Sequence, residues 1–362
     1  MFPVNRSTKT IYLVCTSTHL TGGDIVSQSF VRFRARPLVA AVLSTIMLAA
    51  VPAAHAQSKK ELKISHSAAG DLSSEHHLAA WAFKNYLADN SDTVSARIYP
   101  SSALGDERAV FEGMQLGAGA SCAVAGTAIL NNFSKRVGVI DLPFLWKGYD
   151  HMNRTLDGKV GQAIAADLEK SGIKVLAWTN NWGARNVVTA KKTVNTADDL
   201  KGLKIRTIQS PIYVETINVM GANATPMSFG EIYTAMQTGV LDGFEHGAAA
   251  VVANKLYEVG KNVAITNHFL GPAVFACSMN EWNQLSDTQK KTVMDAAKFA
   301  SDLNRSLAPI REQEALDFLK DKGMTITTVD TTPFRDKATA LQDKIAANIG
   351  ATDLLAEIRA SQ

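Results

Sequence analysis

The alternation of apolar and polar residues predicts a short β-strand in the middle of the chain. Leu203 and Ile205 alternate with two basic residues, and a period of two is typical of a strand with one buried face. The second basic residue is Arg206, at the carboxyl end of the predicted strand. Ser210 and Pro211 then have the pattern of a helix N-cap and a first-turn proline. The predicted order is therefore strand, loop and helix, with an arginine where the strand ends.

The same order recurs along the rest of the chain, and alternating strands and helices predict an α/β fold. The helix predicted at residues 286–322 is expected to bend at Pro309 and is long enough to span two lobes. Strands are predicted at residues 61–65, 94–99, 121–124, 137–142, 175–178, 185–189, 240–244 and 325–329. The other helices are predicted at residues 74–87, 106–116, 160–171, 228–238 and 248–257, with two more from residues 333 and 352.

Residues 31–56 have the pattern of a secretory signal peptide. Arginines at positions 32, 34 and 36 precede an apolar run at residues 38–51, and Ala54-His55-Ala56 forms a small-x-small cleavage site. We expect cleavage after Ala56, so that residues 1–56 are an upstream extension plus a signal peptide. Residues 1–30 fit none of these parts, and we attribute them to a start codon assigned too far upstream. An uncleaved membrane anchor is the alternative, for which the apolar run is short.

The composition is that of an ordinary globular protein of about two domains, with 362 residues, 46% of them hydrophobic and 20% charged. Residues 1–56 hold five basic residues and one acidic residue, so without them the 37 basic and 34 acidic residues of the chain become 32 and 33. A net charge of about −1 provides no basic surface of the kind that binds nucleic acid or anionic lipid.

Two cysteines, Cys122 and Cys277, follow residue 56. They could pair in an oxidising compartment. Cysteine is also a common small buried residue, and the sequence does not place the two Cα atoms within bridging range. We favour two buried thiols.

Sequence signatures of catalysis or of cofactor binding are missing. The chain has no Gly-x-x-x-x-Gly-Lys phosphate loop, no Gly-x-Ser-x-Gly turn, no His-Glu-x-x-His motif and no Cys-x-x-Cys pair. The neighbours His76 and His77 would point roughly 100° apart on a helix, which disfavours a shared metal ion. We therefore expect no cofactor, no metal and no enzyme activity. A secreted hydrolase that uses His76 or His246 as a base is the alternative.

Polar and aromatic residues recur instead at predicted strand ends. Arg185 lies near Asn181 and Trp182, Arg206 ends its own strand, and His246 ends another. In open α/β sheets ligands bind beyond the carboxyl ends of strands, and a guanidinium can hold a carboxylate by two parallel hydrogen bonds. Such groups, supplied by two lobes, favour a binding cleft. The alternative for Arg206 is an ordinary surface arginine.

From about residue 62 to residue 257 the chain carries a series of motifs with a specific order and spacing. The motifs are Tyr99-Pro100 with Leu104-Gly105, Asp141-Leu142-Pro143-Phe144-Leu145, Gly183-x-Arg185, Asp199-Leu200-Lys201-Gly202-Leu203-Lys204-Ile205-Arg206, Met227-x-Phe229-x-Glu231-x-Tyr233 and Ala235-Met236-Gln237-Thr238-Gly239-Val240-x-Asp242-Gly243. In these motifs the chain resembles the DctP-type substrate-binding proteins of tripartite ATP-independent periplasmic (TRAP) transporters. The resemblance implies a two-lobed, periplasmic-binding-protein-like α/β fold with a hinge and a long helix spanning both lobes. It also implies closure on one ligand, which is delivered to a permease driven by an ion gradient.

The resemblance further implies roles for individual residues. Arg206 matches the family's carboxylate-binding arginine, and Arg185 matches a second arginine that would support it. His246 stands where the family often has Asn, which leaves the carboxylate anchor intact but changes the expected specificity. The other ligand-binding residues that it implies are Phe229, Asn181, Trp182 and Glu75, the last as an acceptor for a ligand hydroxyl.

We therefore expect a periplasmic receptor for a small hydroxylated carboxylate, specifically a sugar acid. Its lobes are expected at residues 57–182 with 272–311 and at residues 183–271 with 312–362. We expect a monomer whose partners are its ligand and the TRAP permease subunits, and not nucleic acid. A receptor for an amphipathic or aromatic carboxylate is one alternative, and the sensor subunit of a signalling system with the same pocket is another.

Overall fold

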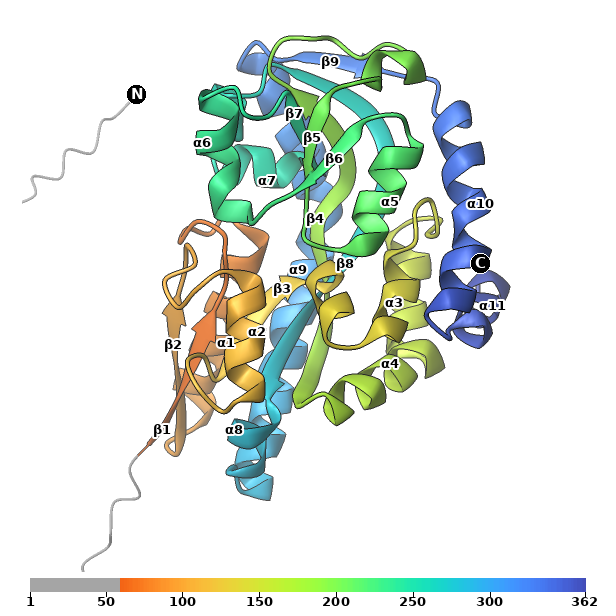
Figure 1. The fold of residues 1–362 in the computed structure, drawn as a ribbon. Helices are drawn as coiled ribbons and strands as arrows, with labels where there is room; N and C mark the ends of the chain where they lie inside the picture. Colours follow the sequence, from red (N-terminus) through yellow and green to blue (C-terminus); the bar gives the residue numbers. More distant parts are fainter. Residues whose placement is uncertain (1–58) are drawn as a thin grey trace, which may run out of the picture. The chain divides into compact units, whose positions relative to one another are not determined.

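One mixed β-sheet organises the structure, a computed structural model that describes residues 59–362. Within these residues the sheet has nine strands in the order β2-β1-β3-β8-β4-β7-β5-β6, and β9 pairs with β8. The two longest strands, β4 (Ile173–Thr189) and β8 (Asn262–Ser278), run antiparallel through its middle (Figure 1). The others are β1 (Lys60–Ser65), β2 (Val94–Tyr99), β3 (Cys122–Gly126), β5 (Lys204–Thr207), β6 (Asn223–Pro226), β7 (Gly243–Gly247) and β9 (Thr325–Thr328).

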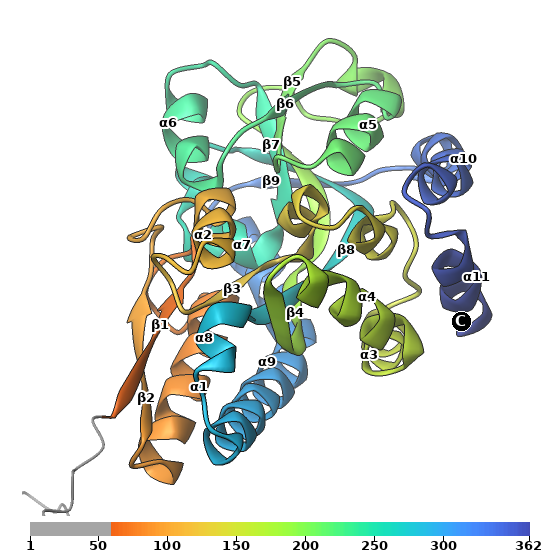
Figure 2. The ribbon, with the colours of Figure 1, turned by 60° about the horizontal axis from the view of Figure 1, so that its bottom comes forward.

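Two lobes are built on the two ends of this sheet, as expected. The first lobe contains the strands β1 to β3 and the second contains β5 to β7, while β4 and β8 pass through both (Figure 1, Figure 2). Buried apolar clusters cover both faces of each half of the sheet. Helices α1 (Glu75–Asn90), α2 (Glu107–Gln115), α3 (Tyr149–Asp157), α4 (Lys159–Lys170) and α8 (Met279–Asn283) surround the first lobe, and α5 (Pro211–Val219), α6 (Ile232–Gln237) and α7 (Ala248–Ala253) the second.

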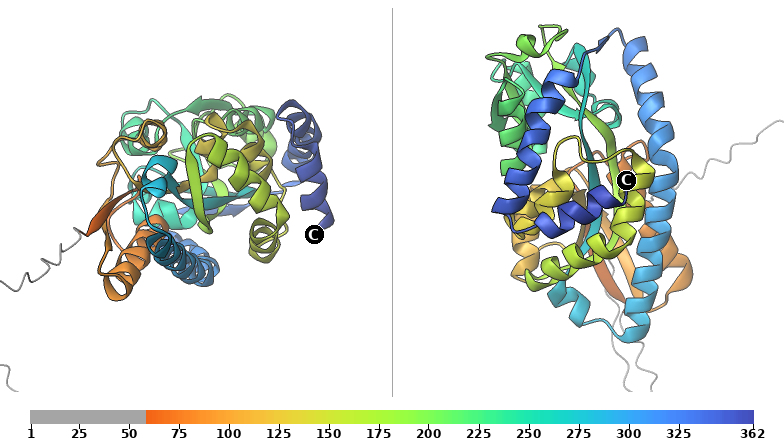
Figure 3. Two further views of the ribbon diagram at one scale, coloured as in Figure 1. Left: turned by 90° about the horizontal axis from the view of Figure 1, so that it is seen from below. Right: turned by 90° about the vertical axis from the view of Figure 1, so that its right-hand side faces the viewer.

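A 35-residue helix, α9 (Asp287–Asp321), runs alongside both lobes (Figure 3). Ser286 caps it by accepting a hydrogen bond from the Gln289 backbone, and the Gln289 side chain accepts one from the Ser286 backbone in return. Pro309 lies inside the helix, as predicted. The expected two-lobed α/β fold with a long spanning helix is thus confirmed.

The structure differs from the predicted local structure at several places. Residues 137–142 were expected as a strand, but a 3₁₀ helix (Lys135–Asp141) occupies most of them, because a short buried apolar run fits either structure. The strands predicted at 175–178 and 185–189 are parts of the single strand β4. The partner strand β8 was not predicted, since both of its faces are largely buried and its sequence therefore lacks the alternation of a half-exposed strand.

The two cysteines of the described chain form a disulfide, so the preference for two buried thiols is wrong. Antiparallel pairing of β3 and β8 puts Cys122 directly opposite Cys277, with their Cα atoms 3.8 Å apart. The two residues are 155 positions apart in the sequence, and only the register of these strands brings them together.

The C-terminal helices α10 (Thr332–Asn348) and α11 (Thr352–Ala360) return from the second lobe toward the first. Leu354, Leu355 and Ile358 of α11 share a buried cluster with Met152 and Leu156 of α3. The sequence did not indicate this packing, and the predicted lobe boundaries stay a prediction. The predicted signal peptide lies outside the described residues. Within residues 59–362, no helix is both long and apolar enough to cross a bilayer.

Candidate functional site

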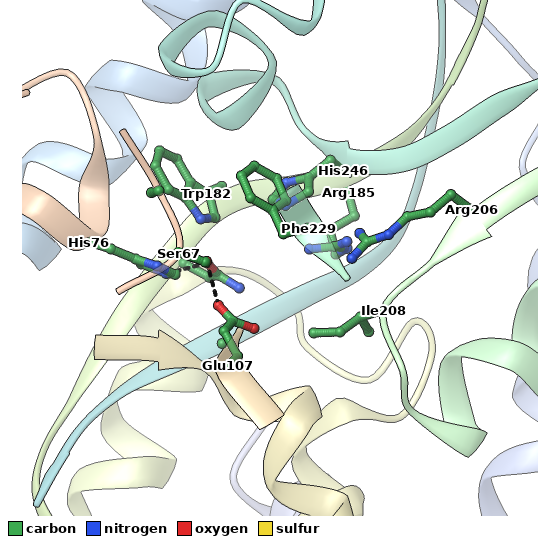
Figure 4. Close-up of a pocket in the computed structure, with 12 residues that line it drawn as sticks. Ser67, His76, Glu107, Trp182, Arg185, Arg206, Ile208, Phe229 and His246 are labelled. Atoms are coloured by element: carbon green, nitrogen blue, oxygen red, sulfur yellow. Dashed lines mark hydrogen bonds between the residues drawn. The ribbon is translucent and has the colours of Figure 1, made fainter. Parts of the chain in front are cut away.

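A small cavity lies where the two lobes face each other, beside the middle of β4. About 360 Å³ inside it, including the part that is open to solvent, is free of protein atoms. Six of the seven predicted ligand-binding residues line this cavity, namely Asn181, Trp182, Arg185, Arg206, Phe229 and His246. All of them except Asn181 are labelled in Figure 4. The structure thus brings together residues from β4, β5, β7 and the segment before α6.

Arg206 is a buried cation that has no carboxylate partner among the described residues. It lies on β5 with only 2% of its surface exposed, and its Nε and Nη2 donate to the Met227 carbonyl at 2.9 and 2.7 Å. No carboxylate of residues 59–362 lies within 4.0 Å of its guanidinium. Burial lowers the pKa of Arg206 to about 10, and the nearby Arg185 acts in the same direction. A buried charge of this kind is costly unless an anion pairs with it.

Arg185 lines the same cavity but is neutralised within the protein. Its Nε donates to Glu245 Oε2 at 2.5 Å, and its Nη2 donates to Glu245 Oε1 at 2.7 Å and to the Glu245 carbonyl at 3.0 Å. Burial opposes ionisation of the Glu245 carboxyl, but Arg185 and His268 outweigh it and lower the pKa of Glu245 to about 2. A direct role of Arg185 in holding a ligand stays a prediction.

His246 presents a neutral ring to the cavity. The Gly247 backbone N–H donates to its Nδ1 at 2.9 Å, so Nε2 carries the proton of the neutral ring. Burial, followed by the neighbouring guanidinium groups of Arg185 and Arg206, holds the pKa of His246 well below its ordinary value. Phe229 packs edge-on against the imidazole, with ring centroids 5.3 Å apart. His246 can therefore donate one hydrogen bond from Nε2.

Asn181 and Trp182 reach the cavity because β4 is irregular at this point. The pairing of β4 with β8 shifts between Asn180 and Ala184, so these two residues lie outside the regular ladder. Asn181 Oδ1 accepts a hydrogen bond from His76 Nε2 at 3.1 Å, and the Trp182 ring lies 5.1 Å from the His76 ring. Both side chains are buried.

Glu75 is the predicted site residue that the structure does not place in the cavity. Its Oε2 accepts a hydrogen bond from Asn304 Nδ2 of α9 at 2.9 Å, and its Oε1 lies 3.6 Å from Arg311 Nη1. Neighbouring residues on a helix point in different directions, so Glu75 faces α9 while His76 faces the cavity. The sequence could not decide which of the two would face the ligand.

His76, Ser67, Glu107 and Ile208 also line the cavity and were not predicted as ligand-binding residues. The Ser67 hydroxyl donates to Glu107 Oε1 at 2.8 Å, and burial raises the pKa of Glu107. Burial lowers the pKa of His76 to about 4, so its ring is neutral near pH 7. Glu107 follows the N-cap Asp106 and reads in the sequence as an ordinary first-turn acid of α2, which is why no local signal identifies it.

Comparison with known proteins identifies relatives in one family of binding proteins. The model of the family described as bacterial extracellular solute-binding protein, family 7 (DctP) matches residues 64–348. The 2,3-diketo-L-gulonate-binding periplasmic protein YiaO of Escherichia coli (strain K12) is 34% identical over 263 residues, which are 72% of this chain and 79% of that protein.

Two solved structures of similar proteins contain bound acids. A TRAP periplasmic solute-binding protein from Bradyrhizobium sp., in complex with α/β-D-galacturonate, is 31% identical, with a TM-score of 0.78 over 83% of this chain and 99% of that chain. Another from Polaromonas sp. JS666, bound to D-erythronate, is 30% identical, with a TM-score of 0.79 over the same shares of the two chains, 83% and 99%.

Proposed function

Because the chain belongs to the DctP family of bacterial extracellular solute-binding proteins, we propose that it is the periplasmic receptor of a TRAP transporter and binds a small hydroxylated carboxylate, specifically a sugar acid. The observation that carries the proposal is Arg206, a buried cation in the interlobe cavity that lacks a carboxylate partner among the described residues. An anionic ligand would supply that partner.

The geometry of Arg206 fits a carboxylate. Its Nε and Nη2 both donate to the Met227 carbonyl, which fixes the plane of the guanidinium. The edge formed by Nη1 and Nη2 remains for a second partner, and two parallel N–H groups match the two oxygens of a carboxylate. Arg185 differs because Glu245 occupies it, so in this proposal it supports the site mainly through its charge.

The other lining groups suit hydroxyls and keto oxygens. His246 offers a neutral N–H donor, while Asn181 and Glu107 add amide and carboxyl groups. An apolar acid would leave the His246 Nε2–H without an acceptor and could not use the remaining hydrogen-bonding capacity of Asn181 and Glu107, which is unfavourable, whereas a polyol chain would satisfy all three groups. The acids bound by the relatives, 2,3-diketo-L-gulonate, D-galacturonate and D-erythronate, share a carboxylate with neighbouring oxygen atoms.

The proposal extends to the partner, the compartment and the chemistry. A receptor of this family would release its acid unchanged to membrane-embedded permease subunits, and would act as a monomer in the periplasm after cleavage at residue 56. We also propose the lobes at residues 57–182 with 272–311 and at residues 183–271 with 312–362, so that the boundaries fall within β4, β8 and α9. Mass spectrometry of the acid recovered after incubation with stoichiometric protein tests the chemistry, and a chemically altered acid would indicate an enzyme.

A thermal-shift panel tests the proposal directly, because a ligand that binds only the native state raises Tm. The panel contains D-galacturonate, D-glucuronate, 2,3-diketo-L-gulonate and D-erythronate. D-Galactose, which lacks the carboxylate, and hexanoate, which lacks the hydroxyls, are the matched controls. We expect at least one sugar acid, and neither control, to raise Tm. A rise with hexanoate alone would contradict the proposed ligand class and favour the amphipathic alternative.

A further inference from the structure

The irregular part of β4 is a bulge of three residues. Asn180 pairs with Pro272 of β8 and Ala184 pairs with Leu270, so Asn181, Trp182 and Gly183 together lie opposite the single residue between those two. Extra residues in one strand lose part of the hydrogen-bond ladder and redirect their side chains. The bulge therefore turns Asn181 and Trp182 into the cavity, and something other than β8 has to hold its shape.

Two side chains of α9 hold the two ends of this bulge. The Asn180 backbone N–H donates to Asn304 Oδ1 at 2.8 Å, and the Ala184 backbone N–H donates to Glu312 Oε1 at 2.9 Å. Asn304 and Glu312 lie on either side of Pro309, where the helix lacks a backbone donor. The bulge is thus fixed to the long helix at the point where that helix is most easily bent.

Glu312 is also held from a third direction. Its Oε2 accepts a hydrogen bond from the Tyr149 hydroxyl of α3 at 2.6 Å. Gly183 has a φ of +87°, and a Cβ atom there would lie 2.7 Å from Glu312 Cδ. Only glycine leaves room for the carboxylate against this turn. Glu312 is therefore fixed between α3, α9 and the bulge, although it does not line the cavity.

We propose that Glu312 is a positioning residue for ligand binding, which acts by holding the β4 bulge in the shape that presents Asn181 and Trp182 to the ligand. This inference rests on the proposed function, because it assumes that the ligand occupies the cavity beside the bulge. Glu312 binds no ligand atom in this proposal, and its effect on affinity passes through the Ala184 N–H. The Glu312 side chain on α9 thereby controls the positions of Asn181 and Trp182 in the cavity.

The test compares Glu312→Ala, Glu312→Gln and the control Glu314→Ala by titration calorimetry with D-galacturonate. Glu314 is an exposed acid on the same helix. Glu312→Ala should weaken binding by about tenfold or more, since it removes both the acceptor of the Ala184 N–H and the bond to Tyr149 that holds this acceptor in place. Glu312→Gln keeps an acceptor for Ala184 and should stay within about threefold of the parent. Glu314→Ala should bind as the parent does.

A double-mutant cycle separates positioning from mere stabilisation. If Glu312 acts through the bulge, Glu312→Ala should cost much less affinity in an Asn181→Ala background than in the parent. Equal losses in both backgrounds, or parent-like affinity of Glu312→Ala, would overturn the proposal. If Glu312→Ala does not fold, Tyr149→Phe replaces it in the cycle, with an expected loss of about threefold.

Hydrogen exchange measured without a ligand tests the positioning role of Glu312 separately from the proposal that the ligand is a sugar acid. Glu312→Ala should speed exchange at the backbone amides of residues 180–184 and leave the β1 and β2 amides unchanged. Lack of D-galacturonate binding by the parent would count against the ligand proposed above, and the exchange result would then decide the positioning role by itself. Unchanged exchange at residues 180–184 would overturn that role.

Discussion

Arg185 and Arg206 line the same cavity, yet only Arg185 has a carboxylate partner within the described chain. Glu245 holds the Arg185 guanidinium through both carboxylate oxygens, whereas within residues 59–362 the guanidinium of Arg206 donates only to the Met227 carbonyl. The same type of side chain is therefore part of the folded framework at one position and free to bind an anion at the other. The two arginines should respond differently to substitution.

Substitution of Arg206 should remove binding with little effect on folding. Loss of one partner of a buried charge pair costs about 2 to 5 kcal/mol, so Arg206→Ala should bind D-galacturonate at least about 30-fold more weakly. Arg206→Lys keeps the charge but loses the planar fork, and it should also bind weakly. Titration calorimetry of the folded variants measures both, with the exposed Arg154→Ala as control. Affinity of Arg206→Ala within about threefold of the parent would place the carboxylate elsewhere.

Substitution of Arg185 should instead destabilise the fold. Arg185→Gln leaves Glu245 as a buried carboxylate without its cation, which typically costs about 3 to 5 kcal/mol. The double variant Arg185→Gln with Glu245→Gln removes both charges and should recover part of this loss. Urea denaturation of both variants at pH 7 gives the free energies of unfolding. The prediction fails if the double variant is less stable than Arg185→Gln alone.

Glu75 should make the stability of the protein depend on pH. Burial raises the pKa of its carboxyl from 4.5 to about 7, although Arg311 opposes this shift. The folded protein then holds the proton more tightly than the unfolded chain, so the stabilisation is present below about pH 4.5 and is lost as pH rises through about 7. Glu75→Gln has no such proton, and its stability relative to the parent should increase across that range.

Urea denaturation of the parent and Glu75→Gln at a series of pH values tests this difference. Burial also raises the pKa of Asp141 to about 7, but Asp141 is present in both proteins and its contribution cancels. A stability difference that stays constant with pH would show that Glu75 ionises normally. The same variant tests the predicted ligand role of Glu75, because weaker D-galacturonate binding by Glu75→Gln would support the prediction from the sequence.

The Cys122–Cys277 disulfide should stabilise the first lobe. A cross-link that closes a long loop restricts the unfolded chain, and removal of a native disulfide typically costs about 2 to 5 kcal/mol. The parent should therefore unfold at lower urea concentration after reduction. The variant Cys122→Ala with Cys277→Ala should not respond to the reductant. Two reactive thiols in the unfolded parent without reductant would contradict the disulfide.

The sequence could predict the parts of the site that are local. Arg206 is placed by alternation within its own strand and by the helix start that follows, and the structure has both features. The anion-binding role could be proposed from these few residues and their resemblance to a family. Local patterns were sufficient here because a strand end and a helix N-cap are defined by neighbouring residues.

Features that depend on distant pairing could not be predicted in this way. Glu107 enters the cavity because α2 packs beside it, and Cys122 meets Cys277 because of a strand register. Strand β8 went unpredicted because burial on both faces removes the alternation that identifies a strand. Glu75 and His76 are adjacent on one helix, and the sequence does not show which of them faces the cavity. Tertiary packing decides this, because it sets how the helix is turned.

Because β4, β8 and α9 pass through both lobes, the lobes cannot easily be exchanged between proteins by engineering. Neither lobe is a continuous stretch of chain, so a cut at any one position does not yield a module that could be moved into another receptor. A chimaera that takes one lobe from a relative would need a matched joint at every crossing, and one joint falls in the bulge that carries Asn181 and Trp182. New ligand specificity is therefore more accessible through substitutions in the cavity lining than through exchange of lobes.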